Sequence, residues 1–93
     1  MKSQIATHNE VVLIGRIRHV GSKIKIKGQD VIRVILSVPN DENYDLEPNN
    51  ISVYFDTAFE KMFRKQKGKA IAVSGHIDSK RGMKIICDVM SFI

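Results

Sequence analysis

Three arginines in apparent β-strands have the chemistry to bind the phosphates of a polyanion. Arg16 and Arg18 alternate with an isoleucine in NEVVLIGRIRHV (9–20), and Arg33 lies within VIRVILSV (31–38). A guanidinium group keeps its charge, donates in a planar fork to phosphate oxygens and can stack on a base. The alternative is that the arginines form the ordinary solvent-facing side of a sheet.

A second group of cations alternates with isoleucines in the segment KIKIK. Lys23, Lys25 and Lys27 therefore share one face of an expected strand. Such a row could follow a sugar–phosphate backbone as point charges, but lysines also discourage an edge strand from pairing with another chain. Both interpretations stay open. Gly21 and Ser22 can form a bulge, so the side taken by the preceding arginines does not fix the side of these lysines.

Tyr54 is the best candidate for stacking on a base. In ISVYF (51–55) it alternates with Val53 and Phe55, which fall on the core-facing side. Ring stacking contributes about 1–3 kcal/mol per base and tolerates any base. A half-exposed strand tyrosine is the alternative. The other aromatic residues are assigned to the core (Phe59, Phe63 and Phe92) or to an acidic segment where nothing fixes their direction (Tyr44).

No pattern of residues predicts catalysis, a metal site or a cofactor. His8, His19 and His76 lack metal-ligand spacing relative to one another and to Cys87, the single cysteine. No nucleophile, base and orienting group follow a recognisable order, and there is no glycine-rich phosphate loop. We therefore expect a binding protein that is not an enzyme and needs no cofactor.

The charge of the 93-residue chain is unevenly distributed. Residues 39–50 contain four acidic side chains and no basic one, and removing those four charges from the net +5 leaves +9. A basic body favours polyanionic partners. One cysteine, no apolar run of about 20 residues and no secretory signal favour the cytoplasm. We expect a loose leader over 1–8 and one domain over 9–93.

Hydrophobic patterning predicts five strands and one helix. The helix follows the third strand in DTAFEKMFRKQKG, capped by Asp56 or Thr57 and ended by Gly68. A turn at 27–30 makes the lysine segment and its return strand a hairpin, expected to extend from the body as an arm. The expected strands are 9–20 continuing into 23–27, then 31–38, 51–55, 69–77 and 83–93.

This order of elements is typical of the OB-fold, a five-stranded Greek-key barrel, all-β apart from one helix between the third and fourth strands. The first strand must bend to join both halves of such a barrel, and Gly15 relieves the crowding at the bend. We expect the residues before Gly15 to be covered on both faces. Beyond it, one face should open to solvent or to a ligand.

The expected fold divides the remaining basic residues into two groups, one beside the groove and one on the helix. The loop between the last two strands flanks the usual OB-fold groove, so its basic residues join the candidate nucleic-acid-binding set: Lys80, Arg81 and Lys84. The helix closes the bottom of the barrel, away from that groove. A solvated polar face is therefore the favoured interpretation of the basic residues in and just after it: Lys61, Arg64, Lys65, Lys67 and Lys69.

These residues resemble the bacterial single-stranded DNA-binding protein family. The most specific parts are LIGR (13–16), the strand of Arg33 and the KG…V.G.I pattern over 67–77, and the similarity covers nearly all of residues 9–93. The resemblance implies an OB-fold that coats single strands, usually as a homo-oligomer, through a basic groove with stacking aromatics. Arg16 and Arg33 match basic positions of that family.

The chain departs from the family pattern in three ways. It stops at VMSFI, without the acidic-tipped tail that recruits other proteins, so tail-mediated recruitment is not expected. It has no tryptophan, and the family's strand-three tryptophan matches Tyr54 or Phe55, of which the alternation favours Tyr54. The loop over 39–50 is acidic where a DNA-coating surface is usually neutral or basic, so it either shields the groove or is simply solvated.

The sequence therefore predicts a sequence-independent single-stranded DNA-binding protein that acts in replication, recombination, repair or DNA transfer as a dimer or tetramer. Binding to RNA is left open. The tailless form is also similar to the primosomal replication protein B type, an OB-fold dimer that binds single strands and helicase-loading partners. A protein-interaction module that no longer binds DNA is a further alternative, and a hydrolase on an OB-like barrel is disfavoured because no carboxylates cluster at the groove.

Overall fold

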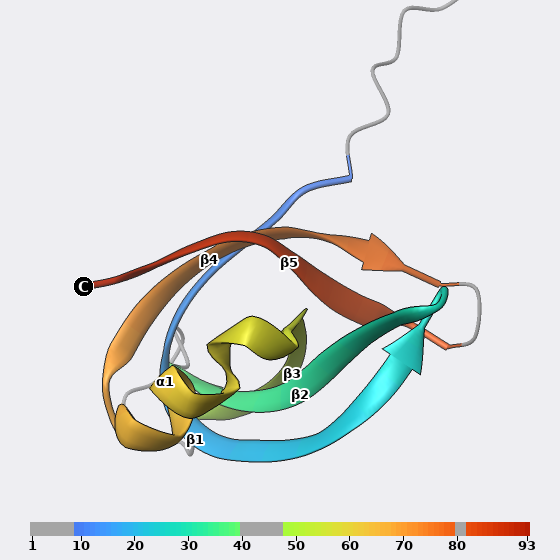
Figure 1. Cartoon of the computed structure of the whole chain (residues 1–93). Coiled ribbons are helices and arrows are strands. Elements are labelled where there is room, and N and C mark those ends of the chain that lie inside the picture. Colours follow the sequence, from blue (N-terminus) through green and yellow to red (C-terminus); the bar gives the residue numbers. More distant parts are fainter. Residues whose placement is uncertain (1–8, 40–47, 80–81) are drawn as a thin grey trace, which may run out of the picture.

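A computed structural model describes residues 9–39, 48–79 and 82–93, and Figure 1 shows these segments wound into a barrel. Its strands close in the order β1-β2-β3-β5-β4, and every neighbouring pair is antiparallel except β3 and β5. The predicted OB-fold is confirmed. The elements are β1 (Val11–Ile26), β2 (Gln29–Val38), β3 (Asn49–Asp56), the 3₁₀ turn η1 (Thr57–Phe59), α1 (Glu60–Lys65), β4 (Ala70–Asp78) and β5 (Lys84–Phe92).

The long first strand joins both halves of the barrel, as predicted. It pairs with β4 from Val11 to Arg16 and with β2 from Arg16 onward. Gly15 lies at this changeover, where a Cβ atom would come within 2.9 Å of the carbonyl oxygen of Ser37. Glycine is therefore needed here because β2 passes too close for a side chain.

The expectation that β1 is covered on both faces before Gly15 is wrong. Leu13 packs against the core, but the side chains on either side of it point outward, with Val12 65% and Ile14 55% exposed. An unbroken apolar run looks the same whether its second face is covered by the same chain or left open. Here no described element covers that face, and α1 closes an end of the barrel instead (Figure 1).

The hairpin of β1 and β2 has a two-residue turn. Lys27 and Gly28 both adopt positive φ angles, 52° and 79°, and Ile26 pairs with Gln29 across them. This conformation matches the twist of the flanking strands, which consequently extend to the turn itself. The tip is not a free arm as expected, since Lys27 Nζ lies 2.9 Å from a carboxylate oxygen of Asp78 on β4.

The strand alternation correctly predicted most of the core. The three strands β1, β2 and β3 supply most buried side chains, and the ring of Phe63 from α1 meets Phe55 edge to face with centroids 4.7 Å apart. Phe59 packs beside Phe63 as expected. Phe92 was wrongly assigned to the core: it lies at the end of β5, 38% exposed, with its ring centroid 6.4 Å from that of Phe63.

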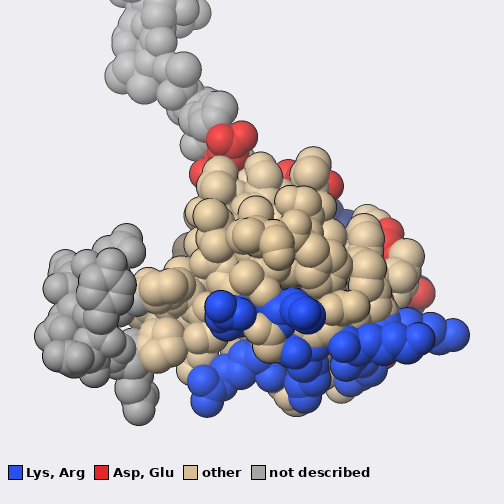
Figure 2. Space-filling model, turned by 90° about the vertical axis from the view of Figure 1, so that its left-hand side faces the viewer, with Lys and Arg blue, Asp and Glu red and all other residues tan. Residues whose placement is uncertain are grey.

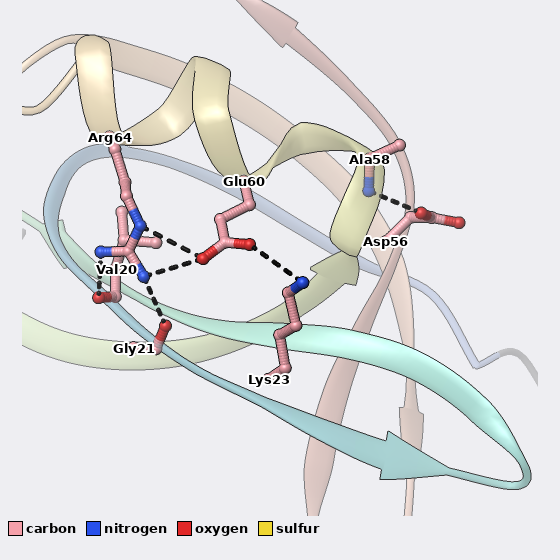
Figure 3. Close-up of polar contacts among 7 residues, drawn as sticks. All are labelled: Val20, Gly21, Lys23, Asp56, Ala58, Glu60 and Arg64. Atoms are coloured by element: carbon pink, nitrogen blue, oxygen red, sulfur yellow. Dashed lines mark hydrogen bonds and ion pairs between the residues drawn. The ribbon is translucent and has the colours of Figure 1, made fainter.

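Specific polar contacts cap the 3₁₀ turn before the helix and attach the helix to β1 (Figure 3). Asp56 caps η1 by accepting a 2.8 Å hydrogen bond from the Ala58 amide, which selects it over Thr57 as the predicted cap. The Arg64 guanidinium donates to the carbonyl oxygens of Val20 (3.3 Å) and Gly21 (3.2 Å). These carbonyls lie where the β1–β2 register shifts, so the bulge expected at Gly21 is confirmed, and Arg64 fixes α1 to it.

Candidate nucleic-acid interface

The side of β1, β2 and β3 that faces away from the core brings Arg33 and Tyr54 together. They are direct partners in the β2–β3 ladder, and directly opposed residues of antiparallel strands share a face. Arg33 is exposed between the buried Ile32 and Val34, and its Nε donates a 3.0 Å hydrogen bond to Ser52 Oγ on β3. This bond holds the guanidinium over β3, beside the tyrosine.

Two further rows continue this surface across the three strands. The register aligns His19 with Ile35 and Ser52, and aligns Arg16 with Ser37 and Asn50. We call the surface formed by these three rows the β1–β3 outer face. It contains no carboxylate, which favours contact with phosphates, and its members are Arg16, His19, Arg33, Ile35, Ser37, Asn50, Ser52 and Tyr54.

A shallow hollow lies on the β1–β2 side of this surface. Its volume is about 240 Å³, and its lining includes His19, Arg33 and Ile35 together with the Gly21–Ser22 bulge of β1. Ile24 and Ile35 are apolar and Arg33 is cationic, a combination that suits a planar ring beside a negatively charged group. Sequence reasoning identified Arg33 but not His19 or Ser52 as parts of the outer face. Their alignment depends on how the strands pair, and for His19 the β1–β2 register also contains bulges.

The lysines of the hairpin are placed differently from the arginines. Each has a carboxylate nearby: Lys23 lies 3.7 Å from Glu60, Lys25 lies 3.5 Å from Asp30, and Lys27 is paired with Asp78. Exposed pairs of this kind are weak and can exchange for phosphate contacts. They nevertheless lower the net positive potential of the hairpin, so the row is less basic than its sequence suggests.

Of the other predicted site residues, Arg16 lies at the end of the outer face, and the rest lie apart from it or outside the described residues. Arg16 donates from Nη1 to the carbonyl oxygen of Gly68 at 3.0 Å, and Arg18 is exposed beside it at a register shift in β1. Lys84 begins β5, opposite Asp78. Lys80 and Arg81 lie outside the described residues, as do His8, Tyr44 and most of the acidic segment.

A larger cavity of about 470 Å³ opens between the hairpin turn, the end of β3 and β5, and Tyr54 and Lys27 are part of its lining. Its lining includes the carboxylates of Asp56, Asp78 and Asp88, and His76 Nδ1 lies 2.9 Å from the Asp88 carboxylate. Burial, and secondarily the charge of Asp88, raises the pKa of the Cys87 thiol to about 11. Within the described ranges, no group of three or more His, Cys, Asp or Glu side chains could hold a metal ion.

Comparison with known proteins agrees with the architecture. The sequence itself matches no protein-family model and no curated protein. The chain has the fold of the single-stranded DNA-binding proteins, as the resemblance predicted. One similar structure is the dimeric N-terminal domain of PriB from Thermoanaerobacter tencongensis, with a TM-score of 0.70 and 15% identity over 91% of this chain and 96% of that one.

Two other solved structures show the same likeness. The mitochondrial single-stranded DNA-binding protein Rim1 of S. cerevisiae gives a TM-score of 0.70 at 10% identity, over 95% of this chain and 97% of that one. A deletion mutant of the single-stranded DNA-binding protein from Thermus aquaticus gives 0.69 at 19% identity over all of this chain, which spans 44% of that longer chain. In the part of the chain that is described, no helix has the length and apolar character needed to cross a membrane.

Proposed function

We propose that this protein binds single-stranded DNA without sequence preference through the β1–β3 outer face. The observation that carries the proposal is the alignment of Arg33 with Tyr54, because a guanidinium group beside an aromatic ring suits a phosphate and a base. Stacking and phosphate contacts ignore base identity, because every base has a π-face and every nucleotide a phosphate. The fold shared with single-stranded DNA-binding proteins supports the same function.

Its role would be to coat or present single strands during replication, recombination, repair or DNA transfer, without catalysis. The decisive experiment is a fluorescence-anisotropy titration of labelled poly-dT, poly-rU and duplex DNA at several salt concentrations. We expect tight binding to single strands, weaker binding to duplex, and a log–log salt slope of about 0.7 per neutralised phosphate. Absence of binding at low salt would reject the proposal and favour a protein-interaction module, while preference for poly-rU would point to RNA.

A helicase-loading accessory is the second candidate, because the dimeric PriB domain is among the similar structures. That role also requires single-strand binding, so the titration does not separate it from coating. Capture of a replicative helicase or its loader on the purified protein, competed by poly-dT, would support it.

We also infer that two copies associate through the outer side of β1, β4 and β5. The register aligns Val12 with Ser74 and Val89, and Ile14 with Ala72, on this side. Val89 is 67% exposed, and Val12 and Ile14 are more than half exposed. Figure 2 shows a wide area without charged side chains above a band of basic ones. An exposed apolar face without charge can be complementary to its own copy across a two-fold axis.

A further inference from the structure

The turn between α1 and β4 lies directly alongside β1. The Gly68 amide donates to the Ile17 carbonyl oxygen at 2.8 Å, and the Ile17 amide donates to the Lys69 carbonyl oxygen at 3.0 Å. Arg16 adds its side-chain hydrogen bond to Gly68. The backbone of 67–69 therefore extends the β1–β4 pairing beyond Arg16, although the two segments are about fifty residues apart in sequence.

Four exposed basic side chains consequently flank one short stretch of paired backbone, and we call them the basic band: Arg16, Arg18, Lys67 and Lys69. Among the described residues, none of the four forms an ion pair, in contrast to the three hairpin lysines. Figure 2 shows Lys and Arg side chains crossing the lower part of this side of the molecule without acidic ones among them. Within the described ranges, no carboxylate is therefore paired with a member of the band.

The band is continuous with the outer face, because Arg16 belongs to both. From Arg33 the surface passes the row of His19 and then the row of Arg16 before it reaches Lys67. Successive rows are two residues apart along β2, a rise of about 6.6 Å, which is within the reach of extended arginine and lysine side chains. No carboxylate lies in the rows that such a path crosses.

We propose that the basic band extends the single-strand path, so that a strand bound on the outer face continues past Arg16 and over Lys67 and Lys69. This inference rests on the proposed function for the identity of the polyanion. It reassigns two lysines that the sequence favoured as part of a solvated helix face. Their point charges would hold phosphates, with no base contacts, so a longer strand would gain affinity without gaining sequence preference.

The test compares a strand of about 6 nucleotides with one of about 16, which span the site sizes of single OB-folds. For the double variant Lys67→Gln/Lys69→Gln, we expect the log–log salt slope to fall by about 1.4 with the long strand and to stay unchanged with the short one. The matched control is Lys61→Gln/Lys65→Gln, which removes the same charge from exposed positions one helical turn apart on α1.

Each outcome decides a separate question. An unchanged slope with the long strand, or an equal fall in the control variant, would overturn the extended path while leaving the outer face as the site. An equal fall with both strand lengths would also overturn it, because the band would then be the primary site. Failure of the unmodified protein to bind either strand would instead reject the proposed function.

Discussion

Arg33 and Tyr54 lie directly opposite each other on β2 and β3, and both side chains leave the barrel on its outer face. Opposed side chains of antiparallel strands have Cβ atoms about 4.5–5.5 Å apart, so a cation and an aromatic ring are presented within one nucleotide's reach. Ser52 holds the guanidinium on the β3 side through its hydroxyl. This arrangement separates two kinds of contact that substitutions can remove independently.

Replacing Tyr54 with alanine should weaken binding to poly-dT by about 5- to 150-fold, the equivalent of about 1–3 kcal/mol of lost stacking. The salt slope should not change, since no charge is removed. Anisotropy titrations at several salt concentrations measure both quantities. The control is Tyr54→Phe, which keeps the ring; if it loses as much affinity as Tyr54→Ala, stacking is not the contact.

Replacing Arg33 with glutamine should lower the salt slope by about 0.7, because one phosphate contact disappears. Arg33→Lys should keep the slope and still lose affinity, because an ammonium group lacks the planar fork that reaches Ser52 Oγ and a phosphate together. The same titration distinguishes the two variants. Identical slopes for Arg33→Gln and the unmodified protein would show that Arg33 faces solvent only.

The double variant Val12→Glu/Ile14→Glu should be monomeric, because it buries two carboxylates at the inferred interface between copies. Sedimentation equilibrium measures the mass, and we expect the unmodified protein to have at least twice the mass of the variant. Met83→Glu is a control that adds one carboxylate at a position that is 75% exposed and lies outside this face. Equal masses for Val12→Glu/Ile14→Glu and the unmodified protein would contradict the inferred interface.

Replacing Arg64 with methionine should lower the free energy of unfolding by about 1 kcal/mol at neutral pH, through loss of its hydrogen bonds to the Val20 and Gly21 carbonyl oxygens. Arg64 also lowers the pKa of Glu60 by hydrogen bonding, against the opposing effect of burial. A lowered folded-state pKa stabilises the fold above the unfolded value and loses that effect as pH falls through the folded value. The difference in the free energy of unfolding between the unmodified protein and Arg64→Met should therefore become smaller at acid pH.

Urea unfolding at neutral pH and near pH 3 measures this gap. Lys61→Met is the control, because it removes the same charge from α1 without a described contact to β1. A gap that stays constant with pH would show that the Glu60–Arg64 pair contributes nothing, whereas the carbonyl contacts would still account for the neutral-pH loss.

Cys87 should react slowly with iodoacetamide. Its pKa rises from 9.0 to about 11, chiefly through burial and then through Asp88, so near neutral pH its thiolate fraction is about 100-fold below that of a free thiol. Because the folded protein favours the protonated thiol, the contribution of Cys87 to the free energy of unfolding is fully present below pH 9. It is lost as the pH rises towards 11. Mass spectrometry of alkylated protein measures the rate, and the urea-unfolded chain is the control; equal rates would contradict the raised pKa.

The order of strands and helix was predictable because alternation, capping and turn signals are local in sequence. The strand register and the contacts across the closed barrel were not predictable, because they join residues that are far apart in sequence. The side on which Tyr54 lies followed from alternation, but its pairing with Arg33 requires the register of two strands. Lys67 was expected on a solvated helix face, whereas backbone hydrogen bonds across the barrel bring its turn beside Arg16. Val12 was expected to be covered because it belongs to an unbroken apolar run, but it is exposed. An apolar side chain alone does not reveal whether another part of the chain packs over it.

The joint between β3 and β5 is the shortest in the barrel: the ladder pairs Val53 with Ile85 and Tyr54 with Ile86, and goes no further. Local opening of a closed sheet requires the fewest broken hydrogen bonds at such a joint. The proposed stacking residue is thus part of the place where the ring of strands comes apart most easily. A nucleic acid that binds only the closed barrel shifts the equilibrium away from opening between β3 and β5. Binding would therefore stabilise the barrel that orients the nucleic acid.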